Sequence, residues 1–330
     1  MKIKHETVLV TGGAGYIGSH AVHALLASGR KVIVIDRDPV ACEHLRKTFS
    51  RRKNKPQIHN CDIDNDVWVN GILQNEKPSA VMHFAADICV PESVKNPLKY
   101  YNNNTAKTIS FVEKLIRNGV YRFIFSSTAA VYGMPTAADN IVEKTVCQPI
   151  NPYGQSKLMV EHVLKKIADS IPAFDYTSFR YFNVAGSHID GKITDPRWTE
   201  KLNVVPTFIS RILSGSQIYV YGTDYNTPDG TAIRDYIHPE DIISAHMIAL
   251  DAEVTGVYNL GSGEGFSVWN MIENFVSVTG EELDVIHKPR RAGDPEVLIA
   301  NSDKFRNLTG WEPKYTLKEM VATAWKAYGR

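Results

Sequence analysis

The segment TVLVTGGAGYIG, from Thr7 to Gly18, joins an apolar run directly to a cluster of glycines. The run Thr7–Thr11 is typical of a strand that is buried inside a parallel sheet. The residues after the glycines, from Ile17 to Ser28, predict a helix, and Gly29 is placed to end it. The segment therefore predicts a strand, a tight turn and a helix, which together form the first unit of an α/β fold.

The glycine spacing indicates a phosphate site. Gly12, Gly15 and Gly18 satisfy G-x-x-G-x-x-G, and Gly13 with the last two also satisfies G-x-G-x-x-G. Glycine permits the tight turn and lets the backbone approach a pyrophosphate at the helix N-terminus. A glycine motif alone is weak evidence, because many turns need glycine. Here it lies between a strand and a helix, and the next predicted strand ends in an acid, which favours a dinucleotide site.

That acid is Asp36, at the end of the predicted strand Lys31–Asp36. We expect its carboxylate to hydrogen-bond the hydroxyls of the adenosine ribose. A carboxylate there repels the extra phosphate of NADP, so NAD is the predicted cofactor, although the adjacent Arg37 could attract that phosphate. Asp62 ends the predicted strand Gln57–Asp62, where it could contact the adenine or cap the following helix.

The first half of the chain alternates strand and helix patterns. Further predicted strands are Ala80–Ala85, Arg122–Ser127 and Tyr176–Tyr181, and predicted helices include Ala106–Arg117 and Ser156–Ala168. Alternation with short connections predicts an α/β fold with a Rossmann-type, doubly wound parallel sheet. We assign residues 1–182 to this NAD-binding domain.

The pattern changes after about Asn183. Pro, Gly and Asp become frequent, and the segments Ser216–Gly222 and Asp284–Pro289 predict strands of a smaller α+β part. The run Gly256–Gly261 is expected to return to the main sheet. We assign residues 183–330 to a C-terminal substrate domain, with the site in the cleft between the two domains.

The overall composition excludes several classes of function. The chain has 330 residues and a net charge of +1, so it lacks the basic surface of a nucleic-acid-binding protein. No apolar run has the length of a membrane span, and the polar N-terminus shows no signal peptide. Its four scattered cysteines indicate free thiols in a reducing cytosol rather than a metal site. The sequence therefore predicts a cytoplasmic protein with no metal, nucleic-acid or membrane partner.

The segment NPYGQSK, Asn151–Lys157, places a tyrosine and a lysine four residues apart at the start of a predicted helix. Tyr153 and Lys157 should therefore share one helix face. A lysine ammonium and a positive nicotinamide ring would both lower the pKa of the phenol, which is near 10 when unperturbed. Such a tyrosine can take a proton from an alcohol while hydride leaves the same carbon. An incidental surface pair is the alternative, but the pair follows a nucleotide loop, which favours catalysis.

The sequence contains three further motifs, HFAA (His83–Ala86), SSTAAVYG (Ser126–Gly133) and YFN (Tyr181–Asn183). Together with the glycine loop and the Tyr153/Lys157 pair, they make the chain resemble the extended short-chain dehydrogenase/reductase family. Through Asp229–His238 and Arg290–Asp294 it is similar to the UDP-glucose 4-epimerases of that family, from Thr7 to about Tyr328. The resemblance implies an isomerase that interconverts UDP-galactose and UDP-glucose. In such an enzyme C4 is oxidised by NAD, the 4-keto sugar turns about its bond to the diphosphate, and C4 is reduced again from the opposite face.

The resemblance implies that Tyr153, Lys157 and Thr128 are catalytic. Thr128 would hydrogen-bond the sugar 4-oxygen and orient the tyrosine. The alternative is that its hydroxyl only hydrogen-bonds backbone groups at the end of a strand. Asn103 would contact the cofactor region or support the catalytic loop, and it could at the same time cap a helix that begins near Thr105. The expected cofactor contacts are Tyr153 and Lys157 together with Gly12, Gly15, Tyr16, Ile17, Gly18, Asp36, Arg37, Asp62, Ile63, Phe84, Ala85, Ala86, Asn103, Ser126 and Tyr181.

The resemblance also implies a site for the UDP group. Two arginines that converge on a diphosphate are chemically sensible, because guanidinium pairs phosphate oxygens in a bidentate manner. The alternative is surface salt bridging, for instance between Arg234 and Asp235. The expected substrate contacts are Thr128, Tyr153, Asn183, Asn203, Val204, Tyr221, Arg234, Arg291, Asp294 and Leu298.

The chain departs from the family pattern at several positions. Ile88 stands where some members carry a lysine that contacts the cofactor, and Arg37 replaces a small polar residue of some members. The segment Ile193–Asn203 lacks the usual His/Glu-rich pattern near the uridine. Leu298 lies at the position beside the sugar, where bulk is associated with rejecting N-acetyl sugars. Leucine is of intermediate size, so glucose and galactose are favoured.

Other functions compete with this interpretation. A nucleotide-sugar 4,6-dehydratase would carry Asp-Glu after the threonine, whereas Ala129 and Ala130 follow Thr128 here. Epimerases of other UDP sugars (N-acetylhexosamine, arabinose or glucuronate) stay open. A non-catalytic NAD-binding protein would be expected to lose Tyr153 or Lys157, and both are present. By analogy we expect a homodimer in which the helices Ala106–Arg117 and Ser156–Ala168 pair with their symmetry mates.

Overall fold

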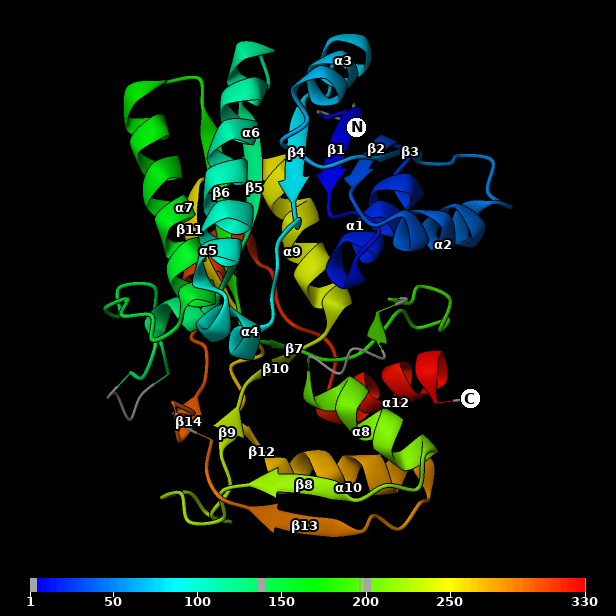
Figure 1. The fold of residues 1–330 in the computed structure, drawn as a ribbon, viewed down its shortest axis with the longest axis vertical. Coiled ribbons are helices and arrows are strands. Elements are labelled where there is room, and N and C mark those ends of the chain that lie inside the picture. The colour runs from blue at the N-terminus through cyan, green and yellow to red at the C-terminus, as the bar shows by residue number, and fades with distance from the viewer. Residues whose placement is uncertain (1–4, 136–139, 196, 199–202, 292, 330) are drawn as a thin grey trace.

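A seven-stranded parallel sheet forms the centre of the larger part of the molecule (Figure 1). The computed structural model of the chain describes residues 5–135, 140–195, 197–198, 203–291 and 293–329. The strand order β11-β6-β5-β4-β1-β2-β3 is that of a doubly wound sheet extended by one strand. This confirms the predicted fold class. The strands are β1 (Thr7–Thr11), β2 (Lys31–Asp36), β3 (Gln57–Asn60), β4 (Ala80–His83), β5 (Arg122–Thr128), β6 (Asp175–Tyr181) and β11 (Gly256–Leu260).

Helices cover both faces of this sheet, and each face has its own hydrophobic core. One core contains apolar side chains of α1 (Tyr16–Ala27), α2 (Pro39–Phe49) and α9 (Pro239–Ala252). The other contains apolar side chains of α3 (Asp66–Glu76), α6 (Lys107–Arg117) and α7 (Pro152–Ser170). Strands that are buried on both faces must be apolar throughout, which is why their sequence shows continuous runs rather than alternation.

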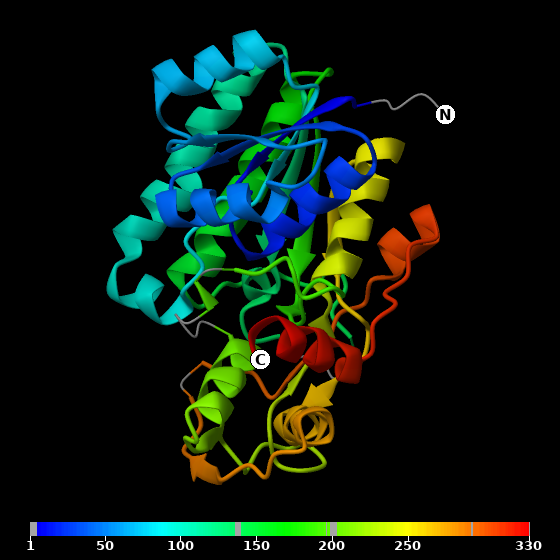
Figure 2. The same ribbon diagram turned by 90° about the vertical axis from the view of Figure 1, so that its right-hand side faces the viewer.

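A smaller part lies beyond the carboxyl ends of β1 and β4 (Figure 1). Its core packs α8 (Val204–Leu213), α10 (Val268–Thr279) and α12 (Leu317–Tyr328) against β8 (Ile218–Tyr221). Figure 2 shows α12, in red, where this part meets the larger one. The remaining elements are α4 (Val90–Lys95), α5 (Pro97–Tyr100), a π-helix (Tyr101–Ala106), a 3₁₀ turn (Ala129–Tyr132), β7 (Asn183–Val184), β9 (Ile233–Arg234), β10 (Tyr236–Ile237), β12 (Phe266–Ser267), β13 (Val285–Lys288), β14 (Val297–Leu298) and α11 (Asp303–Thr309).

Strand β11 shows how the two parts are joined. Although it follows the smaller part's first elements in sequence, it pairs in parallel with β6 at the edge of the main sheet. The division of the chain into domains at residues 182 and 183 stays a prediction. None of the helices in the described segments combines the length and the apolar character that crossing a bilayer requires.

Two alternative interpretations, helix caps at Asn103 and at Asp62, are wrong. Asn103 does not cap a helix, because it lies inside a π-helix that continues directly into α6. Asp62 does not cap α3 either, because Asn65 occupies that position and accepts the N–H of Trp68. Strands β3 and β4 also end two residues earlier than predicted. Their last predicted residues lie at the carboxyl edge of the sheet, where they line a cleft.

Helices α1 and α9 each carry a buried histidine. His20 lies on α1, and burial lowers its pKa to about 4. His246 lies on α9, and burial lowers its pKa to about 4 as well. The Nδ1 atom of His246 lies 2.8 Å from the Ile242 carbonyl oxygen, and its Nε2 atom lies 2.7 Å from the Tyr181 hydroxyl. This geometry fits a neutral ring that donates to the carbonyl and accepts from the phenol.

We expect the protein to lose stability on mild acidification. A histidine whose pKa is depressed on folding binds its proton first in the unfolded state, so its stabilising effect is complete above pH ~6.5 and is lost toward pH ~4. The free energy of unfolding should fall by roughly 1.4 kcal/mol per pH unit for each such histidine. Urea denaturation at pH 7 and pH 5 measures this fall. His246→Gln should reduce the slope, and His162→Gln, at an exposed position, should leave it unchanged; equal stability at both pH values in the wild type would contradict the prediction.

Candidate active site

A cleft of about 1470 Å³ runs along the carboxyl edge of the main sheet. It is lined on one side by the loops that follow β1, β2, β4 and β5 and on the other by residues of β7, β9 and β14. Pockets for small ligands usually measure about 300–1,000 Å³. The cleft is therefore large enough for a dinucleotide and a nucleotide sugar together.

The structure brings nearly all of the predicted site residues to this cleft. Val204 and Tyr221 are the exceptions, because neither lines it. Val204 begins α8 and packs against the core of the smaller part. The guanidinium carbon of Arg291 lies 3.9 Å from the centre of the Tyr221 ring, so Tyr221 supports an arginine that does line the cleft. The segment Ile193–Asn203 is described only in part, because residues 196 and 199–202 lie outside the described residues.

The glycine loop has the geometry that its sequence predicts. Gly12 has a φ of +66°, and a Cβ atom there would lie 2.6 Å from the backbone nitrogen of Ala85. The N–H of Gly15 donates to the Gly12 carbonyl at 3.1 Å, which closes the turn at the start of α1. A side chain at Gly12 would therefore strain the turn and displace the β4 loop. The residues present fit a dinucleotide, because Gly12, Gly15 and Gly18 line the cleft at the N-terminus of α1.

Asp36 is anchored beside this loop. Its carboxylate accepts the backbone N–H groups of Ala14 and Asp38, each at 3.1 Å. Burial raises the pKa of the Asp36 carboxyl, and these hydrogen bonds partly oppose that rise. Its position at the end of β2, within the cleft lining, fits the predicted ribose contact.

Arg37 bridges three segments of the cleft. Its guanidinium donates to the Asp87 carboxylate at 2.7 Å and to the Asn103 side-chain oxygen at 2.8 Å. Its Nη1 atom also lies 3.8 Å from the Asp62 carboxylate, which is itself 2.7 Å from the ammonium of Lys107. Arg37 therefore already faces two acids and an amide, which compete with any phosphate.

Tyr153 and Lys157 lie one helical turn apart at the start of α7. Asn151 caps this helix by accepting the N–H of Gly154 at 2.9 Å, and Pro152 occupies the first helical position. The hydroxyl of Thr128 hydrogen-bonds the Tyr153 side chain and also accepts the N–H of Ala130 at 3.1 Å. Both predicted interpretations of Thr128 are therefore compatible.

The expected lowering of the Tyr153 pKa by Lys157 is wrong for the protein alone. Burial raises the pKa of the phenol, and only the hydrogen bond from Thr128 opposes that rise. The ammonium of Lys157 points elsewhere, because it donates to the Ser126 carbonyl at 2.8 Å and lies 4.8 Å from the Phe125 ring. Burial lowers the pKa of Lys157 to about 7, against an opposing effect of Glu161. The effect of a positive nicotinamide ring stays a prediction.

The sequence does not predict the buried ion pair between Glu161 and Arg180, which lies behind the tyrosine and the lysine. Glu161 continues the same face of α7, and its carboxylate accepts from Arg180 at 2.6 Å and from the hydroxyl of Ser127. Arg180 also donates to the Tyr132 hydroxyl at 2.8 Å. The spacing of Glu161 after Lys157 is visible in the sequence. Its partner lies on β6, and no local pattern identifies that contact.

The opposite end of the cleft holds the predicted UDP residues. Arg234 forms an ion pair with Asp294, and both line the cleft with Arg291. The alternative pairing of Arg234 with Asp235 is wrong. Asp235 is instead buried and accepts the backbone N–H groups of Ser262, Gly263 and Ala300 at 2.8–3.1 Å. The aspartate next to the arginine therefore orders loops, and the more distant aspartate holds the guanidinium.

Comparison with known proteins identifies the family. A model of the NAD dependent epimerase/dehydratase family matches residues 8–261. The chain belongs to this family. A relative from Lactobacillus helveticus, named UDP-glucose 4-epimerase, is 42% identical over 325 residues, which cover 97% of this chain and 96% of the relative. The resemblance predicted from the sequence is therefore confirmed.

Solved structures of family members superpose over nearly the whole chain. A UDP-glucose-4-epimerase from Stenotrophomonas maltophila, with bound NAD and formylated UDP-arabinopyranose, is 34% identical with a TM-score of 0.92 and covers 98% of both chains. A UDP-Glc/GlcNAc 4-epimerase from Campylobacter jejuni is 40% identical with a TM-score of 0.82 and also covers 98% of both chains. The family's dependence on NAD agrees with the glycine loop and with Asp36.

We expect Asp87 to keep this family member selective for NAD over NADP. Asp87→Asn would weaken the hold on Arg37, whose guanidinium could then pair with a 2′-phosphate. The affinity for NADPH relative to NADH should rise on the order of tenfold, as measured by cofactor fluorescence. The double variant Asp87→Asn/Arg37→Met should lose that gain. A gain that survives without the guanidinium, or no gain in the single variant, would show that Asp87 does not act through Arg37.

Proposed function

We propose that the protein interconverts UDP-galactose and UDP-glucose, with NAD as a cofactor that is restored in each cycle. The observation that carries this proposal is the hydrogen bond between Thr128 and Tyr153, one turn from Lys157, in the same cleft as the glycine loop. NAD, when bound, supplies a reversible hydride acceptor, so that C4 of the sugar is oxidised and then reduced with no net redox change. Gly12, Gly15 and Asp36 are proposed to hold its pyrophosphate and adenosine ribose.

Tyr153 is proposed to take the proton of the sugar 4-hydroxyl and later return it. Thr128 would hydrogen-bond the same oxygen and keep the phenol aligned. Because burial raises the pKa of the phenol, the resting tyrosine is protonated, and it becomes a base only when positive charge is added nearby. Lys157, whose pKa is about 7, can hold or release a proton at neutral pH and is placed beside the tyrosine. Together they form an acid–base pair that suits an alcohol oxidation.

The two ends of the substrate meet different surfaces. Arg234 and Arg291 are proposed to bind the diphosphate, with Asn183, Asn203 and Asp294 nearby in the cleft. Between these ends the lining includes the apolar residues Ala129, Ala130 and Leu298. Firm binding remote from the reacting carbon and loose contacts around the sugar would let a 4-keto sugar turn over.

The apolar lining also favours an epimerase over the alternatives. Elimination of water requires an acid and a base beside the sugar, and Ala129 and Ala130 occupy those positions. Leu298 is of intermediate size, which favours glucose and galactose over N-acetylated sugars. The Campylobacter jejuni relative is described as acting on both kinds, so UDP-N-acetylhexosamine is the second candidate substrate.

We further propose that the protein is a homodimer that serves galactose metabolism in the cytoplasm. Helices α6 and α7 lie side by side on one face of the sheet (Figure 1). Each exposes an apolar residue, Ile109 of α6 at 37% and Met159 of α7 at 40%. Pairing of these helices with a second copy would cover both residues. The four free cysteines agree with a reducing compartment.

Incubation with UDP-galactose, without added cofactor and followed by NMR, tests the reaction. We expect UDP-glucose to form with no net NADH. Tyr153→Phe should lower kcat on the order of 10²- to 10⁴-fold while the protein keeps its NAD, because only the proton transfer is removed. UDP-N-acetylgalactosamine in a parallel reaction tests Leu298. A 4-keto-6-deoxy product would make the protein a dehydratase, and unchanged turnover by the phenylalanine variant would remove Tyr153 from the mechanism.

Light scattering coupled to gel filtration tests the dimer. The wild type should have twice the mass of one chain. Ile109→Glu/Met159→Glu should shift it toward the monomer, because two charges would be buried against their symmetry mates. Val67→Glu, at an exposed apolar position of α3, is the matched control and should keep the dimer mass. A monomeric wild type, or a double variant that stays fully dimeric, would contradict the predicted interface.

A further inference from the structure

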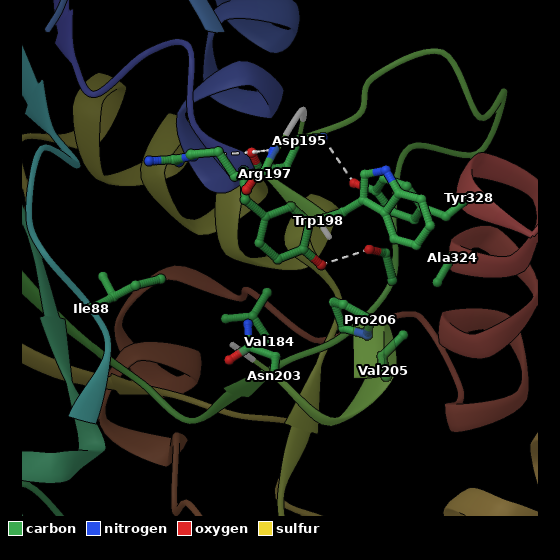
Figure 3. Close-up of a pocket in the computed structure, with 12 residues that line it drawn as sticks. Ile88, Val184, Asp195, Arg197, Trp198, Asn203, Val205, Pro206, Ala324 and Tyr328 are labelled. Atoms are coloured by element: carbon green, nitrogen blue, oxygen red, sulfur yellow. Dashed lines mark hydrogen bonds and ion pairs between the residues drawn. The ribbon is translucent and has the colours of Figure 1, made fainter. Parts of the chain in front are cut away.

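Arg197 reaches the glycine loop from the other side of the cleft. Arg197 lies in the chain segment between β7 and α8, whereas the glycine loop connects β1 of the main sheet to α1. Its Nη2 atom lies 2.7 Å from the place where a Cβ of Gly15 would be. Arg197 and Asp195 line both the large cleft and a small adjoining pocket of about 50 Å³ (Figure 3). The absence of a side chain at Gly15 is therefore what allows this guanidinium to approach the start of α1.

The base of the Arg197 side chain is fixed. The carboxylate of Asp195 accepts the backbone N–H of Arg197 at 2.9 Å and its Nε–H at 3.2 Å. In turn, the backbone N–H of Asp195 donates to the hydroxyl of Tyr328 on α12 at 2.9 Å. Figure 3 shows the Arg197 side chain extended away from Tyr328. This arrangement orients the outer end of the guanidinium toward Gly15.

The positive charge of Arg197 is felt at the cofactor end of the cleft. It lowers the pKa of Asp36, whose carboxyl pKa is otherwise raised by burial. Two other basic side chains of the cleft face acids at other places: Arg37 contacts Asp87, and Arg234 contacts Asp294. Ile88, which lines the same small pocket, adds no charge.

We propose that Arg197 binds the pyrophosphate of NAD, opposite the backbone of the glycine loop. A pyrophosphate at the start of α1 would meet both the N–H groups there and the guanidinium that lies against Gly15, and guanidinium pairs phosphate oxygens in a bidentate manner. Since Arg197 is anchored to the smaller part through Asp195 and Tyr328, the cofactor would be held from both sides of the cleft. This inference rests on the proposed NAD site and not on the reaction that follows.

Cofactor retention tests the proposal without any measurement of turnover. NAD released by acid from equal amounts of purified wild type, Arg197→Gln, Arg197→Lys and Arg211→Gln would be quantified by chromatography. We expect Arg197→Gln to retain much less NAD, and Arg197→Lys to retain an intermediate amount. Arg211→Gln, at a partly exposed arginine on α8 whose guanidinium donates to the Gln217 carbonyl at 2.5 Å, should match the wild type. Equal or greater NAD retention in Arg197→Gln would overturn the proposal.

A comparison of ligand fragments identifies the group that Arg197 contacts. Each protein, after removal of NAD, would be titrated calorimetrically with ADP-ribose, with adenosine and with UDP. Arg197→Gln should bind ADP-ribose on the order of 10- to 100-fold more weakly, because a hydrogen bond to a charged group is lost. Adenosine and UDP affinity should stay at wild-type values. Equal weakening for adenosine would overturn the proposal in favour of a structural role.

The same titrations separate this proposal from the proposed function. A wild type that binds neither NAD nor ADP-ribose would defeat both. A wild type that binds NAD and epimerises UDP-galactose, with Arg197→Gln binding ADP-ribose equally well, would defeat only the role of Arg197.

Discussion

The buried ion pair between Arg180 and Glu161 is the interaction on which the arrangement of the cleft most depends. The two residues are 5% and 3% exposed, and breaking such a pair by removing one partner typically costs about 3–5 kcal/mol. Their remaining polar groups are satisfied by Ser127 and Tyr132, and Tyr132 in turn donates to Asn259 on β11 at 2.7 Å. Because Glu161 lies one turn beyond Lys157 on α7, the pair fixes the rotation of that helix against the sheet.

Burial of this helix face has a chemical consequence. It raises the pKa of Tyr153 and lowers that of Lys157, so burial shifts each group toward its neutral form. The tyrosine–lysine pattern therefore does not by itself create a phenolate. It places a phenol beside an amine whose pKa is about 7. Positive charge added nearby would then lower the pKa of the phenol and favour its loss of a proton. The tyrosine would then be activated only when a positively charged cofactor occupies the cleft, and proton transfer would be limited when the cleft is empty.

The sequence predicted the sheet well because its strands are decided locally. The runs Thr7–Thr11 and Lys31–Asp36 match β1 and β2, since strands buried on both faces must be continuously apolar. It failed where distant contacts decide. Asn103 was a reasonable helix cap, but its side chain accepts from Arg37 across the cleft. Tyr221 makes a contact that the sequence does not show, because its ring lies under Arg291. Its contact with the substrate stays a prediction. Motifs give the residue types at a site, whereas contacts between distant elements decide how those side chains are arranged around the cavity.

The cleft places its charges where a two-nucleotide reaction needs them. Cationic groups line both ends of the cleft, Arg197 beside Gly15 and Arg234 with Arg291, and the lining between them includes the apolar residues Ala129, Ala130 and Leu298. Diphosphates are the most strongly charged parts of both NAD and a UDP sugar, so each would be bound at its own end. The nicotinamide and the hexose would then meet in the middle, beside Tyr153. Binding energy is placed far from the reacting carbon, which leaves that carbon free to present either face.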